Sequence, residues 1–122
     1  MSTKTDPLQF AVHVARICEE NRAEDILVLD LRGLSTVADY FVICTGASDR
    51  QMRAIADYIN QYAATIQNKR FGLQGYDVGQ WVLADYVDVV VHIFDEPRRR
   101  YYDLELMWGD APRVDWTRPK TA

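Results

Sequence analysis

Residues 40–51 read YFVICTGASDRQ, in which a strand-forming run is followed at once by the start of a helix. The run from Tyr40 to Thr45 is short and rich in β-branched and aromatic residues, which is typical of a buried strand. Gly46 then interrupts the chain, and Ser48 with Gln51 matches the Ser-x-x-Gln capping box that opens helices. This stretch therefore predicts a buried strand that turns directly into a helix.

The helix that begins there carries one apolar face, as expected of a helix packed against a core. That face consists of Met52, Ile55, Ala56, Ile59, Ala63 and Ile66. Gly72 and Gly75 predict the end of the helix and an open loop. Residues 80–85 and 88–94 follow as two strand-like runs, and the turn between them is so short that we expect an antiparallel hairpin.

Before this region the sequence predicts one more helix and one more strand. Asp6 is placed to cap a helix that has Pro7 in its first turn, where the missing N–H of proline costs nothing. Residues 25–31 predict a buried strand that ends before Gly33. Both elements extend the pattern of short apolar strands packed by amphipathic helices.

After the hairpin, a third helix is expected to start at Pro97, with Glu96 near its cap. Residues 1–108 are then one domain, and residues 109–122 form an extended, mobile tail in which Trp116 can dock. The expected order is helix, strand, strand, helix, strand, strand, helix. A strand–helix–strand crossover implies a parallel pair beside the antiparallel hairpin. The predicted fold class is α/β (α+β), a single mixed β-sheet packed by helices.

Composition limits the possible functions. With 122 residues, of which 48% are hydrophobic, the chain suits one soluble domain, and no apolar run is long enough to span a membrane. The first residues lack the pattern of a signal or transit peptide, so we expect a cytoplasmic protein. The net charge of −4 disfavours a general nucleic-acid coat. Cys18 and Cys44 are expected to be buried, reduced thiols.

The charges are unevenly distributed. Residues 71–97 contain acidic side chains but no lysine or arginine, and Arg98, Arg99 and Arg100 follow immediately. An acidic segment next to a basic one can orient a charged partner. The arginines suit contact with acids or phosphate, or else surface pairing with neighbouring carboxylates; the sequence leaves both readings open.

The ordered motifs of residues 39–50 and 72–108 resemble those of the ribosomal silencing factor family, also called Iojap-related proteins. The residues that carry the resemblance in the second stretch are Trp81, Asp85, His92, Tyr102, Glu105 and Trp108. This resemblance implies a nucleotidyltransferase-like fold without nucleotidyltransferase activity, and commonly a homodimer. It also implies that the chain binds the large ribosomal subunit through the fourteenth large-subunit protein. The bound chain would then sterically block docking of the small subunit. The alternative role is that of an assembly factor for the large subunit, with which organelle relatives are associated, or of an adaptor protein.

The same resemblance, with the local pattern, suggests a partner-binding surface. Its candidate residues are Trp81, Asp85, His92, Phe94, Glu96, Arg99 and Tyr102. Trp81 suits an aromatic anchor, and Asp85 suits contact with a basic ribosomal protein. The simpler alternatives are a core tryptophan, a turn-capping aspartate and a structural histidine at position 92. The stripe around Tyr102 at helical spacing is more typical of a core.

An enzyme is the main rival, because the fold that the resemblance implies is shared with nucleotidyltransferases. Nucleotidyl transfer needs paired carboxylates to hold divalent metal ions. The chain has no Asp-x-Asp, and Asp85 and Asp88 lie on either side of the expected turn. The histidines and cysteines show no metal-ligand spacing. We therefore expect no catalysis, no metal and no cofactor. Departures from the family pattern are Val87, where glycine is frequent, and Gln74, where an acid is common.

Overall fold

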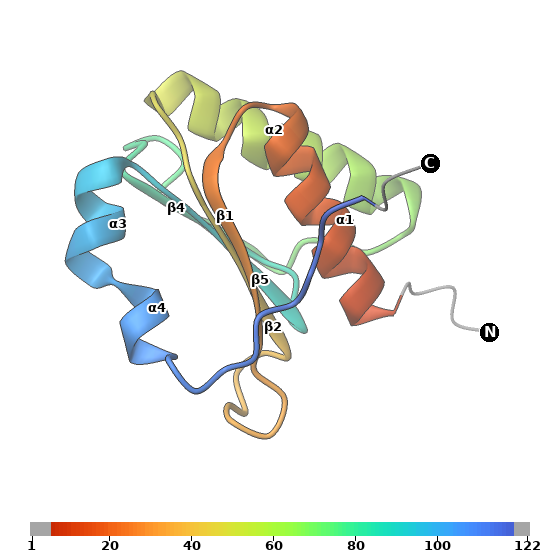
Figure 1. Cartoon of the computed structure of the whole chain (residues 1–122). Coiled ribbons are helices and arrows are strands. Elements are labelled where there is room, and N and C mark those ends of the chain that lie inside the picture. Colours follow the sequence, from red (N-terminus) through yellow and green to blue (C-terminus); the bar gives the residue numbers. More distant parts are fainter. Residues whose placement is uncertain (1–5, 119–122) are drawn as a thin grey trace.

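The computed structural model describes residues 6–118, in which five strands form one mixed sheet with the order β1-β2-β5-β4-β3 (Figure 1). The strands are β1 (Glu24–Asp30), β2 (Tyr40–Thr45), β3 (Gly72–Gln74), β4 (Trp81–Asp85) and β5 (Val89–Phe94). β2 and β5 run parallel, and the other neighbouring pairs are antiparallel. The predicted mixed sheet, with its parallel pair and its β4–β5 hairpin, is confirmed.

Two helices, α1 (Pro7–Glu20) and α2 (Asp49–Thr65), pack on one face of this sheet. The predicted capping box of α2 is present: Ser48 Oγ accepts from the backbone N–H of Gln51 at 3.1 Å, while the Gln51 side chain accepts from that of Ala47. The cap predicted for α1 differs, because the Asp6 side chain makes no capping hydrogen bond. Instead the backbone carbonyl of Asp6 accepts from the N–H of Phe10.

Side chains from α1, α2 and the inner positions of β2, β4 and β5 fill the larger core. Cys18 and Cys44 are both free and buried there, as predicted. A hydrogen bond with Cys44, together with burial, raises the pKa of the Cys18 thiol. The Cys18 thiol is therefore held in its protonated, unreactive form.

The structure differs from the predicted elements at two places. The loop expected at Gly72 contains β3, a short edge strand that pairs with β4. The single third helix is divided into α3 (Glu96–Tyr102) and α4 (Leu104–Met107), because Asp103 between them adopts a left-handed φ of 45°. Asp95 caps α3, accepting from the N–H of Arg98 at 2.9 Å, and Glu96 lies next to this cap as expected. Both short helices lie on the face of the sheet opposite α1 and α2 (Figure 1).

The segment after Trp108 follows the outer edge of β1 and then lies beside α1 (Figure 1). The N–H of Asp30 donates to the carbonyl of Pro112 at 2.8 Å, and the N–H of Val114 donates to the carbonyl of Val28 at 2.9 Å. Trp116 packs against the larger core, so the docking considered for it is found. Pro119, also expected in the tail, lies outside the described residues.

Gly75 offers a test of the loop that precedes β4. Its φ is +76°, and a Cβ at this position would lie 1.9 Å from the backbone carbonyl oxygen of Trp81. We expect Gly75→Ala to lower the free energy of unfolding by more than about 2 kcal/mol. The cost of a left-handed backbone at alanine is added to the cost of the clash between its Cβ and the Trp81 carbonyl. Gly33→Ala is the control: its φ is +81°, but nothing lies within 4 Å of the added Cβ. Equal urea-unfolding midpoints for the two variants would contradict this.

Candidate functional site

The second face of the sheet, under α3 and α4, has a separate and more open core. Buried side chains from β1, β2 and β5 meet Leu104 and Ala111 there, and Trp81, Leu83 and Trp108 are only partly covered. Period-two alternation explains the arrangement, because every second residue of β4 and β5 faces this side. Aromatic rings dominate the surface where β4 and β5 meet α3.

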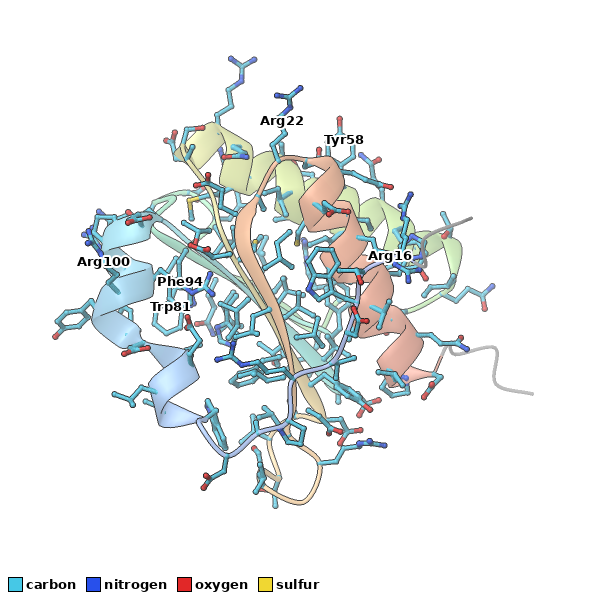
Figure 2. All side chains as sticks on the ribbon, viewed as in Figure 1. Arg16, Arg22, Tyr58, Trp81, Phe94 and Arg100 are labelled. Atoms are coloured by element: carbon cyan, nitrogen blue, oxygen red, sulfur yellow. The ribbon has the colours of Figure 1, made fainter. Side chains whose placement is uncertain are left out.

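Trp81 lies at the centre of these rings. Its ring stacks on that of Phe94, with the two ring centroids 5.0 Å apart. The centroid of the Tyr102 ring, on α3, lies 4.5 Å from that of Trp81. Figure 2 shows Trp81 and Phe94 between α3 and the sheet. Trp81 is half-buried, so it is neither a core tryptophan nor a fully exposed one. We call Trp81, His92, Phe94 and Tyr102 the aromatic cluster.

His92 supports Trp81 from below. It is 4% exposed, and its Nδ1 accepts a hydrogen bond from the Trp81 indole Nε1–H at 3.2 Å. Nδ1 is therefore unprotonated, and the proton of the neutral ring lies on Nε2. Nε2 is buried and has no partner among the described residues. Burial lowers the pKa of His92 to about 4. The His92 imidazole is thus uncharged and packs against the Trp81 indole.

This burial predicts a pH dependence of stability. His92 has a folded pKa of about 4, whereas imidazole in an unfolded chain has a pKa of about 6.5. Because the unfolded state takes up the proton first, the contribution is fully present above about pH 6.5 and declines as the pH falls toward 4. We expect a loss of about 2 kcal/mol between pH 7 and pH 5 in urea unfolding. His92→Gln should remove most of that loss. If the unfolding free energy of this variant depends on pH as strongly as that of the unmodified protein, His92 is not the cause.

An exposed apolar surface adjoins the aromatic cluster on α3 and α4. Tyr101, Tyr102, Leu106 and Met107 are 80%, 40%, 78% and 68% exposed. We call these four residues the α3–α4 patch. A stripe at this spacing is more typical of a core, although Tyr102 is also a candidate for partner contact; in the structure only Leu104 and Trp108 turn inward. The division at Asp103 explains the difference, because a broken helix cannot keep all of its apolar residues on one side.

The three arginines of α3 all have carboxylate partners. Arg98 pairs with Asp95 at 3.5 Å and Arg100 pairs with the exposed Glu96 at 3.9 Å. Arg99 is buried, pairs with Glu105 at 3.2 Å and donates to Thr45 Oγ1 at 2.9 Å. Arg99 therefore ties α3 to α4 and to the end of β2. Glu105, which carried the resemblance but was not among the candidate site residues, is the partner that sequence spacing did not identify.

Asp85 lies apart from the aromatic cluster, at the opposite end of β4 from Trp81. Its Oδ1 accepts from the N–H of Val87 at 2.8 Å, which caps the hairpin turn. Val87 has a left-handed φ of 74°, which glycine adopts more readily than a β-branched residue. The structure thus brings together four of the candidate residues, puts Glu96 and Arg99 on the adjoining helix, and separates Asp85.

Residues 6–118 hold no group of three or more His, Cys, Asp or Glu side chains that could bind a metal ion. Over the same residues, no helix combines the length and hydrophobicity needed to cross a membrane. The second face carries exposed or half-buried aromatic rings and aliphatic side chains. Such a surface suits association with another macromolecule.

The sequence matches known proteins over nearly its whole length. Residues 4–122 match the family described as "Ribosomal silencing factor during starvation". The chain is 52% identical over 103 residues to the ribosomal silencing factor RsfS of Bacillus subtilis (strain 168), a match that covers 83% of this chain and 86% of that protein. It is 34% identical to the chloroplastic protein Iojap of Arabidopsis thaliana, covering 90% of this chain and 46% of that longer protein.

Solved structures agree with the sequence matches. A crystal structure of a Chromobacterium violaceum protein aligns with a TM-score of 0.82 at 30% identity, covering 86% of this chain and 88% of that one. One from Bacillus halodurans aligns with a TM-score of 0.73 at 38% identity, covering 88% and 95%. On the family match and the identities together, the chain belongs to the ribosomal silencing factor family.

Proposed function

We propose that this protein silences ribosomes by binding the large ribosomal subunit on its subunit-joining face, where it sterically excludes the small subunit. The family supports a role in ribosome silencing. The observation that carries the proposal further is the α3–α4 patch, which leaves large apolar side chains in water beside the half-buried Trp81. A contiguous apolar patch on a small protein marks a binding surface.

Within that surface, we assign direct contact to Trp81 and Tyr102. Aromatic residues that keep some exposed area and lose it on binding commonly dominate the energy of protein interfaces. His92 and Phe94 are too buried to reach a partner, so their role is to hold the Trp81 ring in position. Arg99 has the same kind of role, because its contacts fix α3 and α4.

The proposed partner is a basic protein of the large subunit, the fourteenth, as the family resemblance implies. Residues 95–110 carry five carboxylates and three arginines, so the segment is net acidic. Because each of those arginines already has a carboxylate partner, the segment favours a basic protein over RNA phosphate. Contact with ribosomal RNA at Arg98 and Arg100 is the less favoured arrangement.

Cosedimentation with purified subunits tests this proposal. We expect the protein to sediment with large subunits and not with small subunits. Tyr101→Ser should weaken the association, whereas Tyr58→Ser should leave it unchanged, because Tyr58 is half-exposed on α2 and away from α3 and α4 (Figure 2). Sedimentation with small subunits, or equal effects of the two tyrosine variants, would contradict the proposed surface.

We also propose that the free protein is a homodimer. The family resemblance suggests this, and exposed apolar side chains outside the α3–α4 patch, such as Phe71 and Val87, offer further contact area. Light scattering at roughly tens of micromolar, a range in which micromolar affinity gives mostly dimer, should report twice the monomer mass of 14.1 kDa. A monomer mass throughout that range would contradict it.

A further inference from the structure

Two adjoining cavities lie at the C-terminal end of α2, on the side of the sheet opposite the aromatic cluster. The larger has a volume of about 500 Å³ and is lined by Asn60, Ala64, Gln67, Asn68, Lys69 and Arg70. The smaller, of about 150 Å³, shares Gln67, Asn68 and Lys69 and extends toward the hairpin turn. Their combined size suits a small ligand rather than a single ion.

Two cationic side chains, Lys69 and Arg70, line the larger cavity. Among residues 6–118, Lys69 and Arg70 form no ion pair, in contrast to the three paired arginines of α3. Asn60 Oδ1 accepts from the Tyr86 hydroxyl at 3.0 Å, which leaves its amide NH₂ group as a donor. The lining therefore combines two cations with side-chain amides.

Arg70 provides the most informative observation. Its Nη1 is buried and has no hydrogen-bond partner among the described residues. The guanidinium also interacts with the Tyr86 hydroxyl through its charge and a hydrogen bond, which offset part of the burial that raises the pKa of that phenol to about 12. A buried guanidinium nitrogen without an acceptor is unfavourable, so a missing acceptor is expected nearby.

The end of α2 offers a partial explanation without a ligand. The last carbonyls of a helix carry partial negative charge and stabilise nearby cations. That effect favours a lysine and an arginine at this position. It does not account for the buried, unpartnered Nη1, because a hydrogen bond to a carbonyl would have satisfied it. An anionic ligand in the cavity would give the accessible donors of both side chains an acceptor.

We propose that this cavity binds the phosphate group of a small phosphorylated ligand of nucleotide size. Lys69 and Arg70 contact the phosphate oxygens, and Asn60 and Asn68 hydrogen-bond the remainder of the ligand. Phosphate matches a guanidinium fork and an ammonium together. A small ligand fits better than an RNA backbone, because the chain has a net charge of −4 and Asp88 lines the adjoining cavity.

Isothermal titration calorimetry of the full chain tests this with a nucleoside diphosphate, with inorganic phosphate and with a short RNA hairpin. We expect saturable binding of one nucleoside diphosphate per chain, with weaker binding of phosphate alone. Lys69→Gln and Arg70→Gln should each weaken that binding about tenfold or more. Arg22→Gln is the matched control, because Arg22 is exposed and lies at the outer edge of the molecule (Figure 2).

Several results would overturn the proposal: no heat from the nucleotide at about 1 mM, an Arg22→Gln effect equal to that of Arg70→Gln, or binding of the RNA hairpin alone. Circular dichroism checks that each variant is folded. If Arg70→Gln does not fold, Lys69→Gln tests the proposal, because Lys69 is exposed and its replacement leaves the core intact. The site is independent of the proposed ribosome contact, so both glutamine variants should still sediment with large subunits.

Discussion

Replacing Trp81 by alanine is expected to weaken binding to the large subunit about thirtyfold or more, which corresponds to about 2 kcal/mol. The indole is half-buried and in contact with Phe94 and Tyr102, so its exposed part forms the floor of the surface beside the α3–α4 patch. Its loss removes that floor and leaves His92 Nδ1 without its donor. Titration of fluorescently labelled protein with large subunits measures the change.

The same substitution should also lower the stability of the free protein, because Trp81 packs against the second core. Trp81→Phe separates the two effects: it keeps an aromatic ring on Phe94 but loses the indole N–H that binds His92. We expect this variant to retain most of the affinity and to lose about 1 kcal/mol of unfolding free energy. Full affinity of a folded Trp81→Ala variant would show that the contact lies elsewhere.

Arg99→Ala should cause the largest loss of stability among the charged residues of α3. The side chain is 9% exposed, and its removal leaves Thr45 Oγ1 and the Glu105 carboxylate without their partner. Breaking a buried ion pair costs about 3–5 kcal/mol, and the partial exposure of Glu105 reduces the expected loss to about 2–3 kcal/mol. Urea unfolding measures this difference directly.

Arg100→Ala is the matched control for that measurement. Arg100 pairs with Glu96 at 3.9 Å, and both side chains are largely in solvent, so the expected change is below about 1 kcal/mol. Since Arg99 fixes α3 and α4, its replacement should also weaken binding to the large subunit, although it touches no partner. Equal stabilities for the two variants would contradict the role assigned to Arg99.

Local pattern predicted most of the fold. Tyr40 to Thr45 and residues 88–94 are strands within a residue of the observed limits, because unbroken apolar runs suit strands buried on both faces. The capping box at Ser48 also holds, since it depends on nearby groups alone. The short strand β3 was missed: three residues beginning at a glycine give no periodic signal, and only pairing with β4 makes them a strand.

The site was predictable only in part, because its geometry depends on contacts between distant residues. The motif order drew attention to Trp81 and His92, but not to the hydrogen bond between them. The burial of Arg99 and its pairing with Glu105 follow from the left-handed turn at Asp103, which no helix-capping rule predicts. The outward position of Leu106 and Met107 has the same cause.

Subunit joining measured by sucrose-gradient sedimentation tests the central claim most directly. Separated large and small subunits are mixed with increasing amounts of the protein at a magnesium concentration that permits joining. We expect the unmodified protein and Tyr58→Ser to lower the yield of joined ribosomes equally. Trp81→Ala and Tyr101→Ser should need a much higher protein concentration to lower the yield by the same amount. An undiminished yield with the unmodified protein, or equal potency of all four proteins, would contradict it.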